Sequence, residues 1–304
     1  MRRFERARSG DAKNAKDLCR RPPRYRESDG GMRVAPRIAV LIRTVALASL
    51  LPVGFIAPTC SWAYRPFIAT DAAVADPKEV EIELGYFTLE RQNNENAFII
   101  PRVVFNYGLF QNWEAVAEFA VLRDSNAELN LIDPALSLKG VLKEGVLQDK
   151  EGVSIAVEAG LLLPSTEQGE SHFGFEGVGI ASAKLGPFMF HLNGGLGIQR
   201  SNGDVVGIWG VIGELPIAKG LRLVGEVDGE KAQRQQLGES GLLGFIWQPW
   251  SSQNVAFDTG VRRRFSGSGP DWQFTFGVTF GFSAASVAQR LLSIKELHGA
   301  SNER

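Results

Sequence analysis

The chain has 304 residues, of which 44% are hydrophobic and 22% charged, and its formal net charge is −1. Two cysteines are too few for a scaffold held by disulfides, and a single long apolar run near the N-terminus excludes a polytopic helical membrane protein. Glycine is frequent, with 34 residues, which exceeds the roughly 7% of average proteins. Composition alone is compatible with one or two globular domains.

The first 63 residues predict export from the cytoplasm. A basic stretch begins at Met32, an apolar core follows over residues 44–57, and Ser61 and Ala63 occupy the small positions of a cleavage site. The alternative is an N-terminal membrane anchor, but an uncharged core of about 15 residues is short for a span of about 20. We therefore expect a signal peptide over residues 32–63, and a segment upstream of the true start codon over residues 1–31.

Cleavage after Ala63 changes the charge of the protein. Residues 1–63 hold 13 of the 33 basic and 5 of the 34 acidic residues, so the remaining 241 residues carry a formal charge near −9. Both cysteines, Cys19 and Cys60, are removed. Thiol catalysis and cysteine-ligated metals are thereby excluded, and nucleic acid is not expected as a partner because no basic patch remains.

The end of the remaining chain shows a two-residue period. Large apolar side chains occupy every second position from Trp272 to Phe282, and small or polar residues lie between them. Strands of soluble sheets usually have about 5–6 residues. Twelve alternating positions are typical of a strand that crosses a bilayer.

The same alternation, with weaker contrast, predicts eleven earlier strands. In residues 98–108 it places Ile99 and Phe105 on one face and Ile100 and Arg102 on the other. The earlier strands are expected at 79–91, 98–108, 113–123, 135–143, 153–163, 178–185, 188–199, 205–215, 221–230, 242–248 and 254–264. With residues 271–282 they make twelve, an even number. The predicted fold class is all-β, a closed antiparallel transmembrane β-barrel.

The connections between these strands alternate in length. Tight turns are expected at 108–112, 186–187, 216–220 and 249–253, and mostly longer polar loops at 91–96, 124–130, 165–172, 200–203, 231–239 and 266–269. Residues 143–152 are the exception, a longer turn among the tight ones. Short turns on one rim and longer loops on the other match an outer-membrane barrel. An exported sandwich or propeller is the soluble alternative.

The predicted domain organisation has three parts after the signal peptide. Residues 64–78 form a periplasmic N-terminal segment, residues 79–282 the barrel, and residues 283–304 a periplasmic tail. In the tail, Val287, Leu291 and Ile294 recur at helical spacing, which predicts a short C-terminal helix.

Four stretches resemble the outer-membrane family named "MetA pathway of phenol degradation". They are residues 64–72, which contain Arg-Pro and Thr-Asp, residues 101–114 with Tyr-Gly-Leu, residues 133–144 with Asp-x-x-Leu-x-x-Lys, and residues 160–165, which end on Leu-Pro-Ser. Departures are Phe110-Gln111 where the family has Thr-Asp, together with Pro134 and Gly140. The resemblance spans most of residues 64–282 and implies a monomeric barrel with a transport role.

Polar residues on the inner face of the predicted strands are the candidate lumen residues. They are Glu114, Glu118, Glu158, His191, Asn193, Arg222, Glu226, Asp228, Asp258 and Arg262. His191 and Asn193 suggest a catalytic pair, but Asn193 stands where a His-x-Ser dyad would have its nucleophile. We therefore expect no catalytic residue, no metal site and no cofactor, and a charge ladder that fills the lumen.

The predicted function is an outer-membrane channel or carrier for small solutes, apolar or aromatic ones included, in a Gram-negative bacterium. Its partners would be outer-membrane lipid, the barrel assembly machinery and a small solute. The alternatives are a structural barrel with a filled lumen and an outer-membrane lipid hydrolase. A lumen packed across its width would favour the structural barrel, and a serine within hydrogen-bond reach of His191 would favour the hydrolase.

Overall fold

A computed structural model describes residues 66–92, 95–167, 169–233, 235–250 and 255–283. Its strands are β1 (Glu79–Gln92), β2 (Glu95–Phe110), β3 (Trp113–Arg123), β4 (Leu129–Lys143), β5 (Ser154–Leu162), β6 (Gly174–Leu185), β7 (Phe188–Ile198), β8 (Val205–Ala218), β9 (Leu221–Ala232), β10 (Gly238–Trp247), β11 (Val255–Ser266) and β12 (Trp272–Ser283). One 3-10 helix, η1 (Val146–Gln148), lies between β4 and β5. The signal peptide, the segment before it and the C-terminal helix fall outside the described residues.

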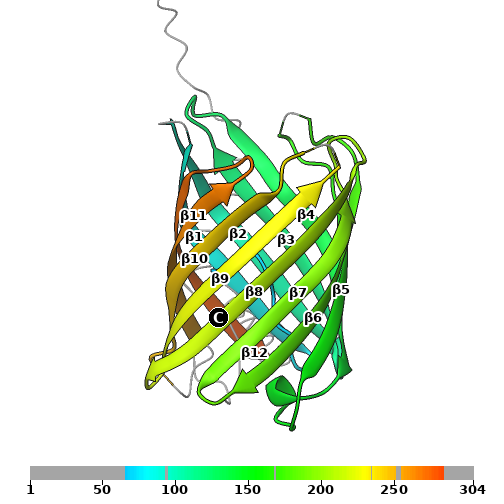
Figure 1. The fold of residues 1–304 in the computed structure, drawn as a ribbon, viewed down its shortest axis with the longest axis vertical. Coiled ribbons are helices and arrows are strands. Elements are labelled where there is room, and N and C mark those ends of the chain that lie inside the picture. The colour runs from blue at the N-terminus through cyan, green and yellow to red at the C-terminus, as the bar shows by residue number, and fades with distance from the viewer. Residues whose placement is uncertain (1–65, 93–94, 168, 234, 251–254, 284–304) are drawn as a thin grey trace, which may run out of the picture. The chain divides into compact units, whose positions relative to one another are not determined.

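The twelve strands form one closed antiparallel barrel in which each strand pairs with its neighbours in sequence and β12 pairs with β1 (Figure 1). Closure leaves no unpaired strand edge, which lipid would penalise by several kcal/mol per buried polar group. The predicted fold class and strand number are confirmed. No helix among the described residues has the length and hydropathy needed to cross a membrane.

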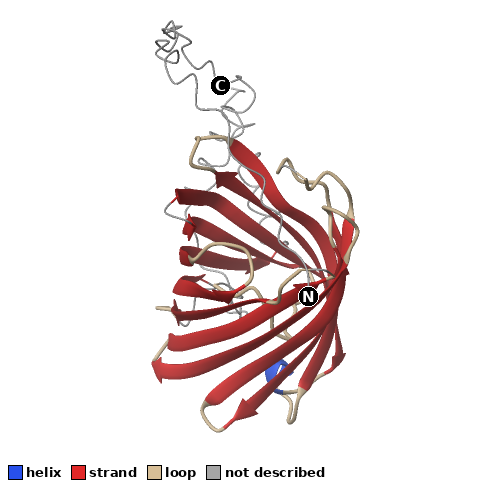
Figure 2. Cartoon of the chain, turned by 45° about the horizontal axis from the view of Figure 1, so that its top comes forward, coloured by secondary structure: helices blue, strands red, loops and turns tan. Residues whose placement is uncertain are grey.

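The two rims differ as predicted. Figure 2 shows the strands as a continuous wall with η1 at one rim. That rim, the lower one in Figure 1, carries short turns, among them the two-residue turn between β6 and β7. The connection 144–153 between β4 and β5, which contains η1, is the longer exception on this rim. The upper rim carries longer loops, including the one between β5 and β6. Several strands extend further toward the loops than predicted: β4 begins at Leu129 and β6 at Gly174.

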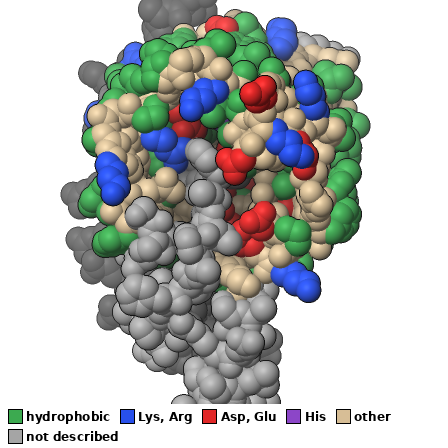
Figure 3. All heavy atoms as spheres, turned by 90° about the horizontal axis from the view of Figure 1, so that it is seen from below, with side chains coloured by type: hydrophobic (Ala, Val, Ile, Leu, Met, Phe, Trp, Pro, Cys, Tyr) green, Lys and Arg blue, Asp and Glu red, His purple; other side chains and the backbone are tan. Residues whose placement is uncertain are grey.

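The outer surface is apolar. In β12, Phe274 and Phe276 are each 45% exposed, while Thr275 between them is 9% exposed. Exposed aromatic side chains lie near both rims, as expected at the two membrane interfaces. Those near the turn rim are Phe110, Phe188, Trp247 and Trp250, and those near the loop rim are Phe173, Phe265 and Trp272. Seen from the turn rim, hydrophobic side chains surround the molecule and acidic ones gather toward its centre (Figure 3). This distribution is that of an outer-membrane barrel.

The predicted faces are wrong at the loop end of β2. Ile99, expected on the outside with Phe105, is 3% exposed and packs inside against Ala120 and Ile132, whereas Ile100 is 47% exposed. The pairing of β2 with β3 shifts register between Ile99 and Arg102. An irregularity of this kind adds a residue to one strand, so the alternation beyond it is inverted.

Candidate functional site

The inside of the barrel contains a stretch of the chain itself. Residues 66–78, which we call the lumen segment, precede β1 and lie against the inner wall. Phe67 packs on buried side chains of β9, β10 and β11, and Ala72 is fully buried beside Ala156 and Ile180. The expectation of a periplasmic segment over residues 64–78 is therefore not met by its described part. Polar groups of the barrel wall hold that part inside.

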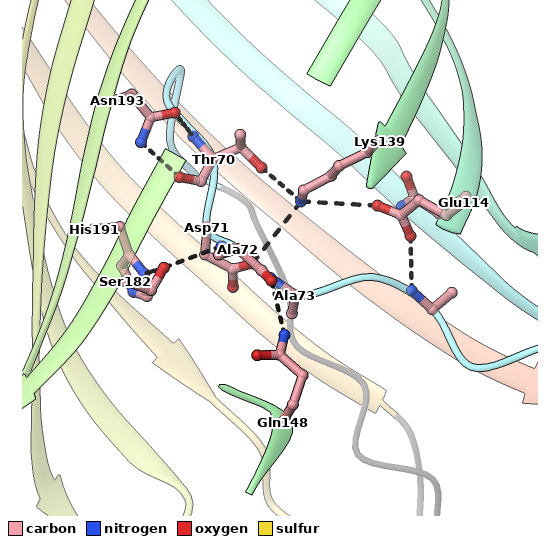
Figure 4. Close-up of polar contacts among 12 residues, drawn as sticks. Thr70, Asp71, Ala72, Ala73, Glu114, Lys139, Gln148, Ser182, His191 and Asn193 are labelled. Atoms are coloured by element: carbon pink, nitrogen blue, oxygen red, sulfur yellow. Dashed lines mark hydrogen bonds and ion pairs between the residues drawn. The ribbon is translucent and has the colours of Figure 1, made fainter. Parts of the chain in front are cut away.

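Side chains of the wall satisfy the backbone of the lumen segment (Figure 4). The backbone N–H donors and their acceptors are Ile68 and Ala69 to Glu226 at 3.0 and 2.7 Å, Thr70 to Asn193 at 3.1 Å, Ala72 to Ser182 at 3.0 Å, and Ala75 to Glu114 at 2.7 Å. The acceptors come from β3, β6, β7 and β9, so the segment bridges distant parts of the wall. A 12-stranded barrel is wider than the eight-stranded ones that wall side chains alone can fill.

Asn193 on β7 recognises both polar groups of one residue. Its Oδ1 accepts the N–H of Thr70 at 3.1 Å, and its Nδ2 donates to the carbonyl oxygen of Thr70 at 2.7 Å. The amide thus pairs with the segment as a neighbouring strand would. Gln148 in η1 adds a donor to the carbonyl oxygen of Ala72 at 2.9 Å.

Lys139 on β4 is the cation that joins the wall to the lumen segment. Its Nζ lies 3.7 Å from Glu114 Oε1 and 3.9 Å from Asp71 Oδ1, and it donates to Thr70 Oγ1 at 3.2 Å. Lys139 is 1% exposed and Asp71 6%. A buried carboxylate needs such a partner, because removal of a charge from water costs several kcal/mol unless it is paired.

Close backbone approach at two glycines shows how tightly the segment fits. A Cβ atom on Gly210 of β8 would lie 2.7 Å from the Cβ of Ala69, and one on Gly108 of β2 would lie 1.9 Å from the carbonyl oxygen of Asp76. Beside Gly108, the N–H of Lys78 donates to the Gly108 carbonyl oxygen at 2.7 Å. The wall has no room for a side chain at either position while the segment is in place.

His191 lies in a chain of buried contacts across three strands. Ser182 Oγ on β6 is 2.8 Å from His191 Nδ1, and His191 Nε2 is 3.3 Å from Glu214 Oε1 on β8. Glu214 also accepts from Arg222 at 2.6 Å. Ser182 is therefore within hydrogen-bond reach of His191. Its oxygen also accepts the N–H of Ala72, so this chain ends on the lumen segment.

The structure places Glu226, Asp228 and Arg262 together. The guanidinium of Arg262 on β11 is hydrogen-bonded to the carboxylates of Glu226 and Asp228 on β9. Ser240 completes the cluster, since its hydroxyl lies 2.8 Å from Asp228 Oδ1 and from Arg262 Nη1. Asp258, also on β11, is 2% exposed.

Glu118 and Glu158, with Ser137 and Glu176, line a cavity of about 70 Å³, whose lining comes from β3, β4, β5 and β6. Within the described part of the chain, no three or more His, Cys, Asp or Glu side chains form a group that could hold a metal ion.

Several contact residues of the lumen were not among the predicted ones. They are Thr70, Asp71, Lys139, Gln148, Ser182 and Glu214. One of them could have been found: the two-residue turn at 186–187 fixes the hairpin register, which places Ser182 directly opposite His191. The contacts of the lumen segment leave no comparable trace in the sequence.

Comparisons with known proteins found similarity to solved structures. No protein-family model and no curated protein matches the sequence. Similar solved structures include an outer membrane channel of Pseudomonas putida F1 (10% identity, TM-score 0.49, 69% of this chain and 97% of that one). Others are the translocator domain of the autotransporter NalP from Neisseria meningitidis (12%, 0.37, 81% and 96%) and the outer membrane channel DcaP of Acinetobacter baumannii (11%, 0.32, 67% and 95%). The resemblance to the phenol-degradation family stays a prediction.

Proposed function

We propose that the protein is an outer-membrane channel for small solutes, and that the lumen segment closes it on the side of the short turns. The observation that carries the proposal is the nature of the contacts inside the barrel. The wall holds the segment mainly through polar and charged side chains from at least four strands. These groups would be hydrated if the segment left, which is the lining that a water-filled pore needs.

The charges of the interior support a preference for cationic over anionic solutes. Among the described residues outside the lumen segment, the buried acidic side chains outnumber the buried basic ones; they are Glu79, Glu81, Glu83, Glu114, Glu214, Glu226 and Asp258 against Lys139, Arg200 and Arg262. Rings of acidic groups favour cations in pores. The family resemblance also suggests apolar or aromatic solutes. Their permeation should be measured as a separate class beside that of charged solutes.

The test is to force the segment out of its place in the full chain. Leucine in the Gly210→Leu variant cannot coexist with Ala69, because even its Cβ would lie 2.7 Å from the Ala69 Cβ. We expect this variant to show a higher conductance in planar bilayers than the unmodified protein, and a reversal potential in a KCl gradient that indicates cation preference. The matched control is Gly207→Leu on the same strand, where a Cβ has no contact closer than 3.9 Å.

A disulfide supplies the opposite test. The chain has no cysteine after residue 60, so Ala69→Cys with Gly210→Cys introduces a single pair. Their Cβ atoms must separate by about 1 Å to reach the usual disulfide spacing of about 3.8 Å. The oxidised variant should not conduct, and reduction should release the segment and raise the conductance toward that of Gly210→Leu, because the side chain on residue 210 then clashes with residue 69. If Gly210→Leu does not conduct, the barrel is a filled structural one; if the oxidised pair conducts fully, the segment is not the barrier.

The contact between Ser182 and His191 favours a second candidate, a lumen-facing hydrolase. A hydroxyl, an imidazole and a carboxylate follow one another as in a catalytic triad. In this structure the hydroxyl is fully buried and accepts the N–H of Ala72, which fits an anchor for the lumen segment. A fluorophosphonate probe, applied to the Gly210→Leu protein, distinguishes a hydrolase from an anchor. If the probe labels this protein and Ser182→Ala abolishes the labelling, the hydrolase is supported.

A further inference from the structure

The contacts of the lumen segment are with its backbone more than with its side chains. Five of its N–H groups donate to four wall side chains, and one of its carbonyl oxygens accepts from Asn193 and another from Gln148. Backbone contacts of this kind give affinity for extended peptides with little dependence on sequence. The wall therefore binds the polypeptide backbone of the segment, whose course bends at Ile68, Ala69 and Ala72.

We propose that the wall of the vacated lumen is a binding site for short peptides, and that the lumen segment is its internal ligand. The proposal rests on the proposed channel, because an external peptide must reach the lumen. It names the class of solute that the wall can bind.

The buried acceptors show why a peptide fits better than a simple cation. Glu226 is 3% exposed, and its carboxylate receives two consecutive N–H groups while Arg262 contacts its other side. A cation could replace those two donors. It could not replace the donor and acceptor that Asn193 needs together, nor the acceptor that Gln148 needs. Buried polar groups are nearly always hydrogen-bonded, so a ligand with alternating N–H and C=O groups meets the whole set.

Lys139 adds a preference for sequence at one position. It approaches both the carboxylate of Asp71 and the hydroxyl of Thr70, and it is itself buried. A peptide with a hydroxyl residue followed by an acidic residue should therefore bind better than one with an amide in place of the acid.

The experiment uses the full chain with its own segment displaced. Thr70→Pro removes the N–H that Asn193 accepts, and Ala72→Glu cannot fit where Ala72 is fully buried. The wall is unchanged in this double variant. The probe is a fluorescent peptide with the sequence of residues 66–78, and its binding is measured by anisotropy in lipid nanodiscs. We expect saturable binding that is weaker in the unmodified protein, whose site is occupied.

Two matched comparisons make the result specific. A peptide with Asp71→Asn should bind about tenfold more weakly, and Lys139→Met in the barrel should remove that difference, as expected of a directly coupled pair. Asn193→Leu should weaken both peptides. A peptide of the same composition in permuted order should bind more weakly than the original.

The outcomes separate this proposal from the channel. The peptide site would be overturned if no peptide bound at millimolar concentration, which is the order of the effective concentration of a tethered segment. Equal binding of the original and Asp71→Asn peptides would overturn the sequence preference assigned to Lys139. Peptide binding by a double variant that conducts no ions would leave the peptide site standing and would refute the channel.

Discussion

The two halves of the lumen satisfy their charged and polar side chains in different ways. Toward the long loops, the arginines pair with acids of the wall and its loops: Arg102 with Asp133 at 2.6 Å, Arg200 with Glu170 at 3.2 Å, and Arg264 with Asp271 at 2.6 Å. Toward the short turns, Glu114, Lys139, Ser182 and Asn193 contact the lumen segment. The first set of contacts persists without the segment, whereas the second depends on it.

This difference indicates where the barrel can open. Displacement of the lumen segment removes partners from the turn half only, and leaves the ion pairs of the loop half intact. A substitution in the turn half should therefore change both stability and closure. An equivalent substitution in the loop half should change stability alone.

The largest effect is expected for Lys139→Met. The substitution leaves Glu114 and Asp71 buried without this cation, and loss of one partner from a buried pair costs about 3–5 kcal/mol. Urea titration of the protein in lipid vesicles should show this loss, and the conductance should rise. Arg200→Met in the loop half is the control: its acidic partners are 41% and 32% exposed, so we expect at most about 1 kcal/mol and unchanged conductance.

A smaller effect is expected for Asn193→Leu. Two hydrogen bonds to Thr70 are lost, each with a net contribution of about 1 kcal/mol. Limited proteolysis should then cut the lumen segment sooner than in the unmodified protein. Asn202→Leu, which removes an exposed contact with Asp204 in an outer loop, should stay within about 0.5 kcal/mol. Equal protection of the segment in both variants would contradict the assigned contacts.

Ser182→Ala should cost about 1 kcal/mol, because the N–H of Ala72 loses its acceptor. Ser240→Ala removes a comparable hydroxyl that contacts only wall residues, Asp228 and Arg262. Both variants should lose stability to a similar degree. Only Ser182→Ala should expose the lumen segment to protease, and a reversed pattern would show that Ser182 does not anchor it.

The smallest effects are expected at the rims, and they have opposite signs. At the turn rim, hydrogen bonds from Lys150 and Asn112 lower the pKa of Glu144. The contribution of Glu144 to stability is therefore present above its unfolded pKa and is lost as the pH falls through its folded pKa.

At the loop rim, burial raises the pKa of Glu167, and the nearby Glu170 and Asp133 add to this. The contribution of Glu167 to stability is therefore present at low pH and is lost as the pH rises through its folded pKa. Carboxyl carbon NMR titrations should show pKa changes in these two directions.

The sequence predicted the wall of the barrel well. Alternation from Trp272 to Phe282 is strong because lipid selects apolar side chains on one face of each strand, and the same constraint operates in every strand. The prediction was wrong where local geometry breaks the period, as at Ile99 and Ile100, because an irregularity of register inverts the faces without a clear sequence signal.

The content of the lumen was much harder to predict. Ser182 follows from the register of a two-residue turn, but the acceptors for Ile68 and Thr70 lie 158 and 123 residues further along the chain. Such contacts depend on which strands face one another across the closed barrel. Local patterns report only near neighbours, so they could not place Glu226 beside Ile68 or Lys139 beside Asp71.

The sequence by itself determined the strand number, the order of the strands, the outer face and the two unequal rims, because each depends on residues a few positions apart and on the demands of lipid. The tertiary structure alone decided that residues 66–78 lie inside the barrel. Their backbone donors are ordinary ones that water could satisfy equally well. Only closure of the twelve strands brings Glu226, Asn193, Ser182 and Glu114 into positions where those donors find acceptors away from water.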